Sequence, residues 1–98
     1  MHTDSLQLSI GQIVKSRAGR DKGDVFLVYE IVDAQYVLLV DGKRRKIDNP
    51  KKKKQKHLTV YNTVLTDLSY RRDNDIKITN SFIRKLLDPF QPAQEGEE

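Results

Sequence analysis

Gln12–Val32 reads QIVKSRAGRDKGDVFLVYEIV, and this stretch decides the predicted fold. Two runs of β-favouring residues, 12–16 and 25–32, flank a loop rich in glycine and charge, a pattern typical of strand–loop–strand. Gly19 and Gly23 have no Cβ, so they can adopt positive φ and let a second backbone approach closely. The loop therefore offers bare backbone amides beside cations, an arrangement suited to a phosphate backbone. Those cations are Arg17, Arg20 and Lys22.

The pattern around this stretch predicts five short strands. They are expected at Ile10–Ser16, Val25–Val32, Tyr36–Val40, Lys43–Ile47 and Leu58–Asn62. In the second strand, apolar residues stand at both odd and even positions, which predicts that the strand is covered on both faces over part of its length. Asp41-Gly42 predicts a type I′ hairpin turn, which needs positive φ twice, and Pro50 has no amide with which to continue the ladder. Tight turns between short strands predict a mostly-β, SH3-like barrel over residues 10–62.

The remaining segments are predicted to be appendages of this barrel. Residues 1–9 are read as a lead-in, and 63–79 as either a short helix or an irregular connection. Thr79-Asn80-Ser81 offers N-cap candidates for a short C-terminal helix, Phe82–Leu87, whose apolar stripe would pack on the barrel. The polar, acidic segment 91–98 is expected to be disordered.

Composition narrows the class of protein further. Ninety-eight residues predict one domain, and the absence of cysteine agrees with a reducing cytosol. The first residues lack the pattern of a signal peptide, and no apolar run approaches the roughly twenty residues of a membrane span. We therefore expect a cytoplasmic protein that does not enter a membrane.

Charge is distributed unevenly along the chain. Gly11–His57 holds thirteen of the eighteen Lys and Arg residues but only six of the fourteen Asp and Glu residues. Like charges so close together repel each other unless a polyanion offsets the cost, so this half of the domain predicts a polyanionic partner.

The same segment resembles the KOW motif, a short RNA-binding element of several ribosomal proteins and some transcription elongation factors. The resemblance rests on Ile13–Ser16, Gly19–Gly23, Tyr36–Gly42, Arg44–Lys46, Asn49–Lys53 and His57-Leu58. In its longer extent it is similar to large-subunit ribosomal protein fourteen of the archaeal and eukaryotic type and to small bacterial relatives of that protein. The resemblance implies binding of RNA, ribosomal RNA above all, and it is the main reason to favour RNA over DNA.

Charge and resemblance together predict a set of RNA-binding residues in a loop and a hairpin that fold side by side. They are Lys15, Arg17, Arg20, Lys22, Gly23, Lys43, Arg44, Arg45, Lys46, Lys51, Lys52, Lys53, Lys54, Lys56 and His57. Lysine supplies compact charges for phosphates, whereas arginine can also stack on bases.

Other functions are less well supported by the sequence. His2 and His57 have no partner at metal or triad spacing, and the glycines lack the lysine and helix of a nucleotide-binding loop, so we expect no enzyme, metal, cofactor or small-molecule substrate. The alternative that remains open is a KOW or SH3-like protein-interaction module of the transcription or translation machinery. Its contact with other proteins, ribosomal proteins included, would use residues 60–90.

Overall fold

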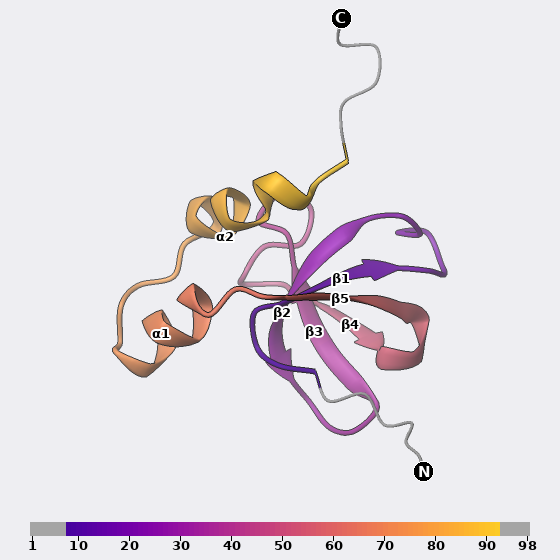
Figure 1. The fold of residues 1–98 in the computed structure, drawn as a ribbon, viewed down its shortest axis with the longest axis horizontal. Helices are drawn as coiled ribbons and strands as arrows, with labels where there is room; N and C mark the ends of the chain where they lie inside the picture. The colour runs from indigo at the N-terminus through magenta and orange to yellow at the C-terminus, as the bar shows by residue number, and fades with distance from the viewer. Residues whose placement is uncertain (1–7, 93–98) are drawn as a thin grey trace, which may run out of the picture.

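The computed structural model describes residues 8–92, and these form one sheet with two helices beside it (Figure 1). The strands are β1 (Gln12–Ser16), β2 (Val25–Ile31), β3 (Tyr36–Val40), β4 (Lys51–Lys54) and β5 (Leu58–Val64). The helices are α1 (Asp67–Asp73) and α2 (Asn80–Leu87), with short 3₁₀ turns η1 (Gln55–His57) and η2 (Asp88–Phe90). The predicted lead-in up to residue 7 and the predicted disordered tail from residue 93 lie outside the described residues. No helix of the described part is long and apolar enough to cross a membrane.

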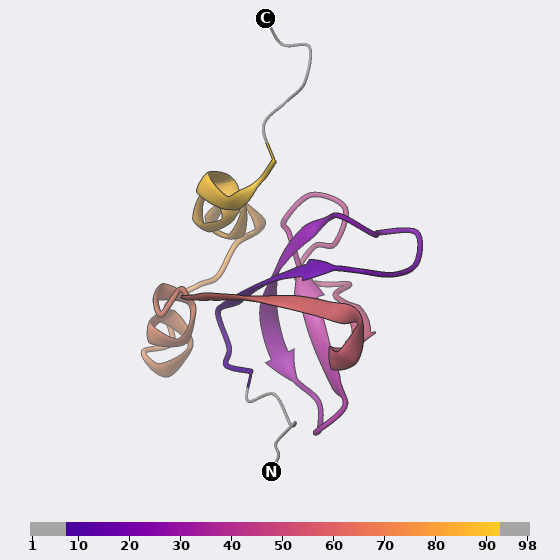
Figure 2. The same ribbon diagram turned by 45° about the vertical axis from the view of Figure 1, so that its right-hand side comes forward.

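The five strands pair antiparallel in the order β4-β3-β2-β1-β5, which confirms a mostly-β fold with a C-terminal helix. The prediction of a closed barrel is wrong, because β4 and β5 are the two ends of this order and no ladder joins them within residues 8–92. The turn η1 carries the chain from the β3 side of the sheet to the β1 side, so β5 pairs with β1 instead of β4. The result is a curled, open sheet (Figures 1 and 2).

Strand β2 is covered on both faces, as its apolar residues at both odd and even positions predicted. Phe26 and Val28 point into one apolar cluster, and Val25 and Leu27 into another. The register keeps the two sets apart, because Phe26 pairs with Val14 and Val28 with Leu39 in the first cluster, whereas Leu27 pairs with Ile13 and Val40 in the second. The sheet is therefore the middle layer of a small two-sided core.

The first cluster lies inside the curl of the sheet. Its buried members are Leu8, Val14, Phe26, Val28, Val37, Leu39 and Leu58, with Val60 partly buried against them. Leu58 comes from one edge strand, whereas Val37 and Leu39 come from β3 near the other edge. Burial of this face thus curls the sheet, although no ladder joins the edge strands β4 and β5 within residues 8–92.

The second cluster joins the helices to the opposite face of the sheet. Ile13, Val25, Leu27 and Val40 of the sheet pack with Leu68 of α1 and with Ile83 and Leu87 of α2. The segment 63–79, which the sequence left open between helix and irregular connection, contains α1. The predicted helix 82–87 starts two residues earlier, with Thr79 as N-cap accepting a hydrogen bond from the Phe82 amide at 3.1 Å.

The fourth strand is not where the sequence predicted it. Lys43–Ile47 is an irregular loop, and the strand that pairs with β3 is Lys51–Lys54. The prediction of a type I′ turn at Asp41-Gly42 is also wrong. That turn needs two residues with positive φ, and among residues 41–50 only Gly42 has a positive φ, at 79°. Ten residues, 41–50, join β3 to β4 and pack against α2, and these contacts override the local hairpin preference.

Candidate nucleic-acid interface

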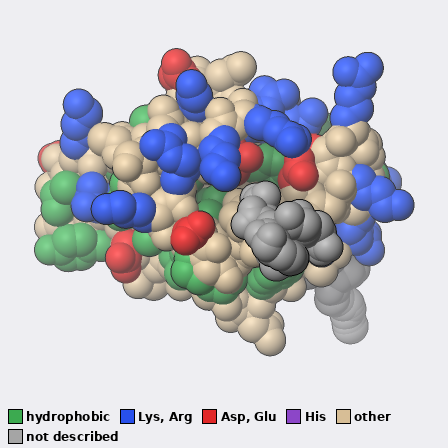
Figure 3. Space-filling model, turned by 90° about the horizontal axis from the view of Figure 1, so that it is seen from above, with side chains coloured by type: hydrophobic (Ala, Val, Ile, Leu, Met, Phe, Trp, Pro, Cys, Tyr) green, Lys and Arg blue, Asp and Glu red, His purple; other side chains and the backbone are tan. Residues whose placement is uncertain are grey.

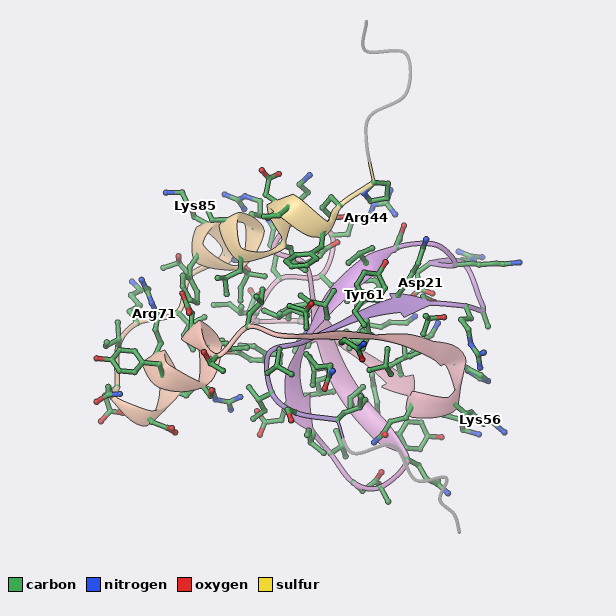
Figure 4. All side chains as sticks on the ribbon, in the orientation of Figure 1. Asp21, Arg44, Lys56, Tyr61, Arg71 and Lys85 are labelled. Atoms are coloured by element: carbon green, nitrogen blue, oxygen red, sulfur yellow. The ribbon has the colours of Figure 1, made fainter. Side chains whose placement is uncertain are left out.

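A hollow of about 180 Å³ lies between the loop 17–24, which joins β1 to β2, and the loop 41–50, which joins β3 to β4. It is lined by Arg20, Asp21, Asp24, Phe26, Arg44, Arg45 and Lys51. We call this site the loop hollow. Four predicted RNA-binding residues from two segments distant in the chain line the same hollow, and Figure 4 shows Asp21 of one loop and Arg44 of the other on the same side of the molecule.

The β1–β2 loop is held by its own backbone. Gly19 and Gly23 have φ of 86° and 92°, as the sequence predicted for them. The Gly23 amide donates to the Ser16 carbonyl at 2.9 Å, and the Lys22 amide donates to the Gly19 carbonyl at 3.2 Å. These bonds close the loop into a compact turn, so its cations project from a defined base.

A buried ion pair fixes the same loop to the edge strand β4. Lys53 Nζ lies 2.7 Å from Asp21 Oδ1 and donates a second hydrogen bond to the Ala18 carbonyl at 2.8 Å. Ser16 Oγ donates to the same carboxylate oxygen at 2.7 Å. The side chains of Lys53 and Asp21 are only 9% and 16% exposed. Lys53, which we predicted to contact RNA, is therefore engaged inside the protein.

This environment changes the acidity of Asp21. Burial raises the pKa of its carboxyl, but the hydrogen bonds from Lys53 and Ser16 and the charge of Lys53 outweigh burial, so the pKa lies below its usual value of 3.8. The carboxylate stays ionised at neutral pH and keeps its hold on Lys53.

The second loop is fixed by a side chain within it and by α2. Asp41 Oδ1 accepts hydrogen bonds from the amides of Lys43 and Arg45, both at 2.9 Å. Arg84 Nη1 of α2 donates to the Gly42 carbonyl at 2.8 Å. Asn80 Oδ1, also of α2, accepts a hydrogen bond from the Ile47 amide at 2.9 Å. The helix thus positions the loop that carries Arg44 and Arg45.

The other predicted residues do not line the loop hollow. Exposed side chains are those of Arg17, Lys22, Lys43, Lys46, Lys52 and Lys56; Lys15, Gly23, Lys54 and His57 are half-buried. Lys52 and Lys54 alternate with Lys51 and Lys53 along β4 and lie over the ring of Tyr36, at 4.8 and 5.9 Å from its centroid. They form a second basic group on the other face of this strand.

Basic side chains of α2 add to this surface, although the sequence did not single them out. Viewed from above, Lys and Arg side chains are spread along one face of the molecule (Figure 3). Arg84 and Lys85 line a shallow hollow with Ser81 and Asp88. Two adjacent cations on the polar side of an amphipathic helix were the signal that could have identified them.

The described residues offer no group of three or more metal-ligating side chains. Their arrangement instead provides cations on two fixed loops, with carboxylates between them. Such a surface can hold a polyanion by charge and by hydrogen bonds.

Comparison with known proteins identifies a relative of the chain. No model of a protein family matches the chain. The chain is similar to the protein named "Putative ribosome-binding protein YbzG" of Bacillus subtilis (strain 168), with 33% identity over 73 residues. The match covers 74% of this chain and 99% of that protein.

Proposed function

The chain belongs to the family of the putative ribosome-binding protein YbzG of Bacillus subtilis, and from this premise we propose that it binds the ribosome through ribosomal RNA. Ribosome binding would place its action in the cytoplasm, as the sequence predicts. The name of that relative refers to the ribosome and not to RNA, and binding through RNA is part of the proposal. It is supported by the resemblance of Gly11–His57 to the KOW element and by the charge of the two loops.

The observation that carries the proposal is the shared lining of the loop hollow. Arg20 comes from the β1–β2 loop, whereas Arg44 and Arg45 come from the β3–β4 loop. Both loops are fixed by hydrogen bonds before any ligand arrives, so little conformational freedom is lost on binding. Cations that neutralise phosphates release condensed counterions, and this release supplies much of the affinity for a nucleic acid.

Folded RNA fits this surface better than double-stranded DNA does. A DNA major groove is usually read by a protruding helix or a two-stranded ribbon, and the longest helix of the described part, α2, spans eight residues and packs on the sheet. Fixed cations on loops suit the phosphates and irregular shape of folded RNA. The proposed role is non-catalytic and requires no cofactor.

A second candidate function is docking of a protein on the helices. Thr66, Asp67, Tyr70, Arg71, Ile76 and Phe82 line a hollow of about 460 Å³ between α1 and α2. Tyr70 and Ile76 are 62% and 41% exposed and line this hollow together, so they form an exposed apolar surface. A ribosomal protein or a polymerase subunit could cover them.

Co-sedimentation with purified ribosomal subunits over a series of salt concentrations separates these functions. Binding through RNA phosphates predicts that log affinity falls linearly with log salt, with a slope of about 0.7–0.9 per phosphate contacted. Docking through the helical hollow predicts a weak salt dependence and loss of binding in a Tyr70→Ala, Ile76→Ala double variant. Absence of co-sedimentation at low salt would refute the ribosomal assignment itself.

A further inference from the structure

The loop hollow contains acidic groups that a simple phosphate site would not need. Asp21 and Asp24 lie among its four cations, and a carboxylate repels a phosphate. Asp21 Oδ1 is held by Lys53 and Ser16, whereas Asp21 Oδ2 is buried without a hydrogen-bond partner among the described residues. Asp24 is paired with Arg44 through one oxygen, Oδ2, and its side chain is 36% exposed at the hollow. The hollow thus has hydrogen-bond acceptors beside its cations, which suits a ligand that donates hydrogen bonds as well as carrying negative charge.

Asp24 also fixes one edge of an exposed arginine. Its Oδ2 accepts a hydrogen bond from Arg44 Nη1 at 3.2 Å, while the Arg44 side chain is 80% exposed. A guanidinium held by one edge keeps both flat faces open. Such a plane is a stacking surface for an unpaired base.

The two partners belong to different loops, and each loop is held by hydrogen bonds. The Asp24 carbonyl accepts from the Ser16 amide and the Asp24 amide donates to the Asp21 carbonyl, both at 2.9 Å. Next to Arg44, the Arg45 amide donates to Asp41 Oδ1 at 2.9 Å. The platform is therefore built before binding.

We propose that the loop hollow receives a single unstacked nucleotide from a loop or bulge of folded RNA. Its base stacks on Arg44, its N–H groups donate to Asp24, and the neighbouring phosphates lie against Arg20, Arg45 and Lys51. The volume of about 180 Å³ is below the roughly 300–1,000 Å³ of drug-sized ligand sites and suits one small ring system. The inference rests on the proposed function, since it names the part of the RNA that the surface would recognise.

The test compares two RNAs that differ by one nucleotide: a fully paired duplex, and the same duplex with a single bulged nucleotide. Because stacking of one base typically raises affinity several-fold, the unmodified protein is expected to prefer the bulged RNA about fivefold or more. Arg44→Lys keeps the charge and removes the plane, so it should abolish this preference for the bulged RNA. Asp24→Asn should alter which of the four bases is preferred at the bulge.

Arg71→Lys is the matched control, because it makes the same exchange on α1, at the other side of the molecule from the β1–β2 loop (Figure 4). It should retain the preference for the bulged RNA. Equal affinity of the unmodified protein for both RNAs, or an unchanged preference in Arg44→Lys, would overturn the inference and leave the proposed function standing. Failure to bind either RNA, or any ribosomal RNA, would overturn both.

Discussion

At the scale of single residues, Lys53 shows how a position in a charge run can be structural. It sits between Lys52 and Lys54, yet its ammonium is buried and bonded to Asp21 and Ala18. The alternation of a strand accounts for this, because β4 turns every second side chain toward the curl of the sheet. One of four adjacent lysines therefore holds the β1–β2 loop, and the others remain available for a ligand.

Lys53→Met should destabilise the protein because it leaves the Asp21 carboxylate without its partner in a nearly buried site. We expect a loss of roughly 2 kcal/mol in the free energy of unfolding, between the values for exposed and fully buried pairs. Lys52→Met, in the same strand, is the control and should cost about 0.5 kcal/mol through its contact with the Tyr36 ring. Denaturant unfolding measures both; equal effects would show that the buried pair does not stabilise the fold.

The Asp21 carboxyl should also make stability depend on pH. Its pKa in the folded protein lies below 3.8, its usual value, because of Lys53 and Ser16. The stabilisation is thus fully present above that usual value and is lost as pH falls through the folded pKa. The difference in unfolding free energy between the unmodified protein and Asp21→Asn should be constant from pH 5 to 7 and shrink below about pH 4. A difference that grows on acidification would contradict the assigned ion pair.

At the scale of elements, α2 is the support of the β3–β4 loop. Gly42 lies so close to the helix that an added Cβ would stand 2.6 Å from the Asn80 carbonyl oxygen and 2.8 Å from Arg84 Cγ. Together with the hydrogen bonds from Arg84 to Gly42 and from Ile47 to Asn80, this contact fixes the loop that bears Arg44 and Arg45. A helix outside the basic segment therefore shapes the basic surface.

Comparison of Gly42→Ala with a second glycine substitution should distinguish the energetic cost of this contact from the cost of backbone strain. Gly23→Ala is the matched control, because Gly23 also has positive φ but an added Cβ would meet nothing within 4 Å. The control should lose about 1–2 kcal/mol of unfolding free energy. Gly42→Ala should lose about 2 kcal/mol more, since the helix or the loop must move. Equal losses in thermal or denaturant unfolding would mean that the loop does not depend on α2.

The same elements show what the sequence could and could not predict. Tyr36–Val40 and the positive φ of Gly19 and Gly23 follow from local residue preferences, and the structure has them as predicted. The strand expected at Lys43–Ile47 failed because contacts with α2, about forty residues away, decide the conformation there. Four lysines have little strand preference of their own, so the pairing of β4 with β3 could be learned only from the fold.

The candidate site was predictable in part for the same reason. The sequence identified the cations of both loops, because charge runs are visible without a structure. It did not identify Asp21 and Asp24 as members of the site, nor Arg84 as the support of Gly42, since these roles arise from contacts between distant segments. It also placed Lys53 with the ligand-binding residues, and it could not show that this side chain is only 9% exposed and paired with Asp21.

At the scale of the whole molecule, the sheet carries the apolar core on its faces and supports the basic loops at its ends. Its curled face and its helix-covered face hold the two apolar clusters, and this double core supports loops whose cations face solvent. The net charge of only +4 understates the asymmetry, because thirteen of the eighteen Lys and Arg residues lie within Gly11–His57. The resulting uneven distribution of charge would orient the protein on an RNA surface and speed its association with the RNA.

The central claim is that the β1–β2 loop and the β3–β4 loop bind the same RNA molecule. Charge reversal tests this claim most directly. Arg20→Glu and Arg45→Glu, singly and combined, are titrated with ribosomal RNA over a series of salt concentrations, with Lys77→Glu between the two helices as a control of equal charge change. We predict that each single reversal weakens binding and lowers the salt slope by about one, that the double variant loses more, and that Lys77→Glu changes little. Unchanged affinity in the double variant, or an equal loss in Lys77→Glu, would contradict the account.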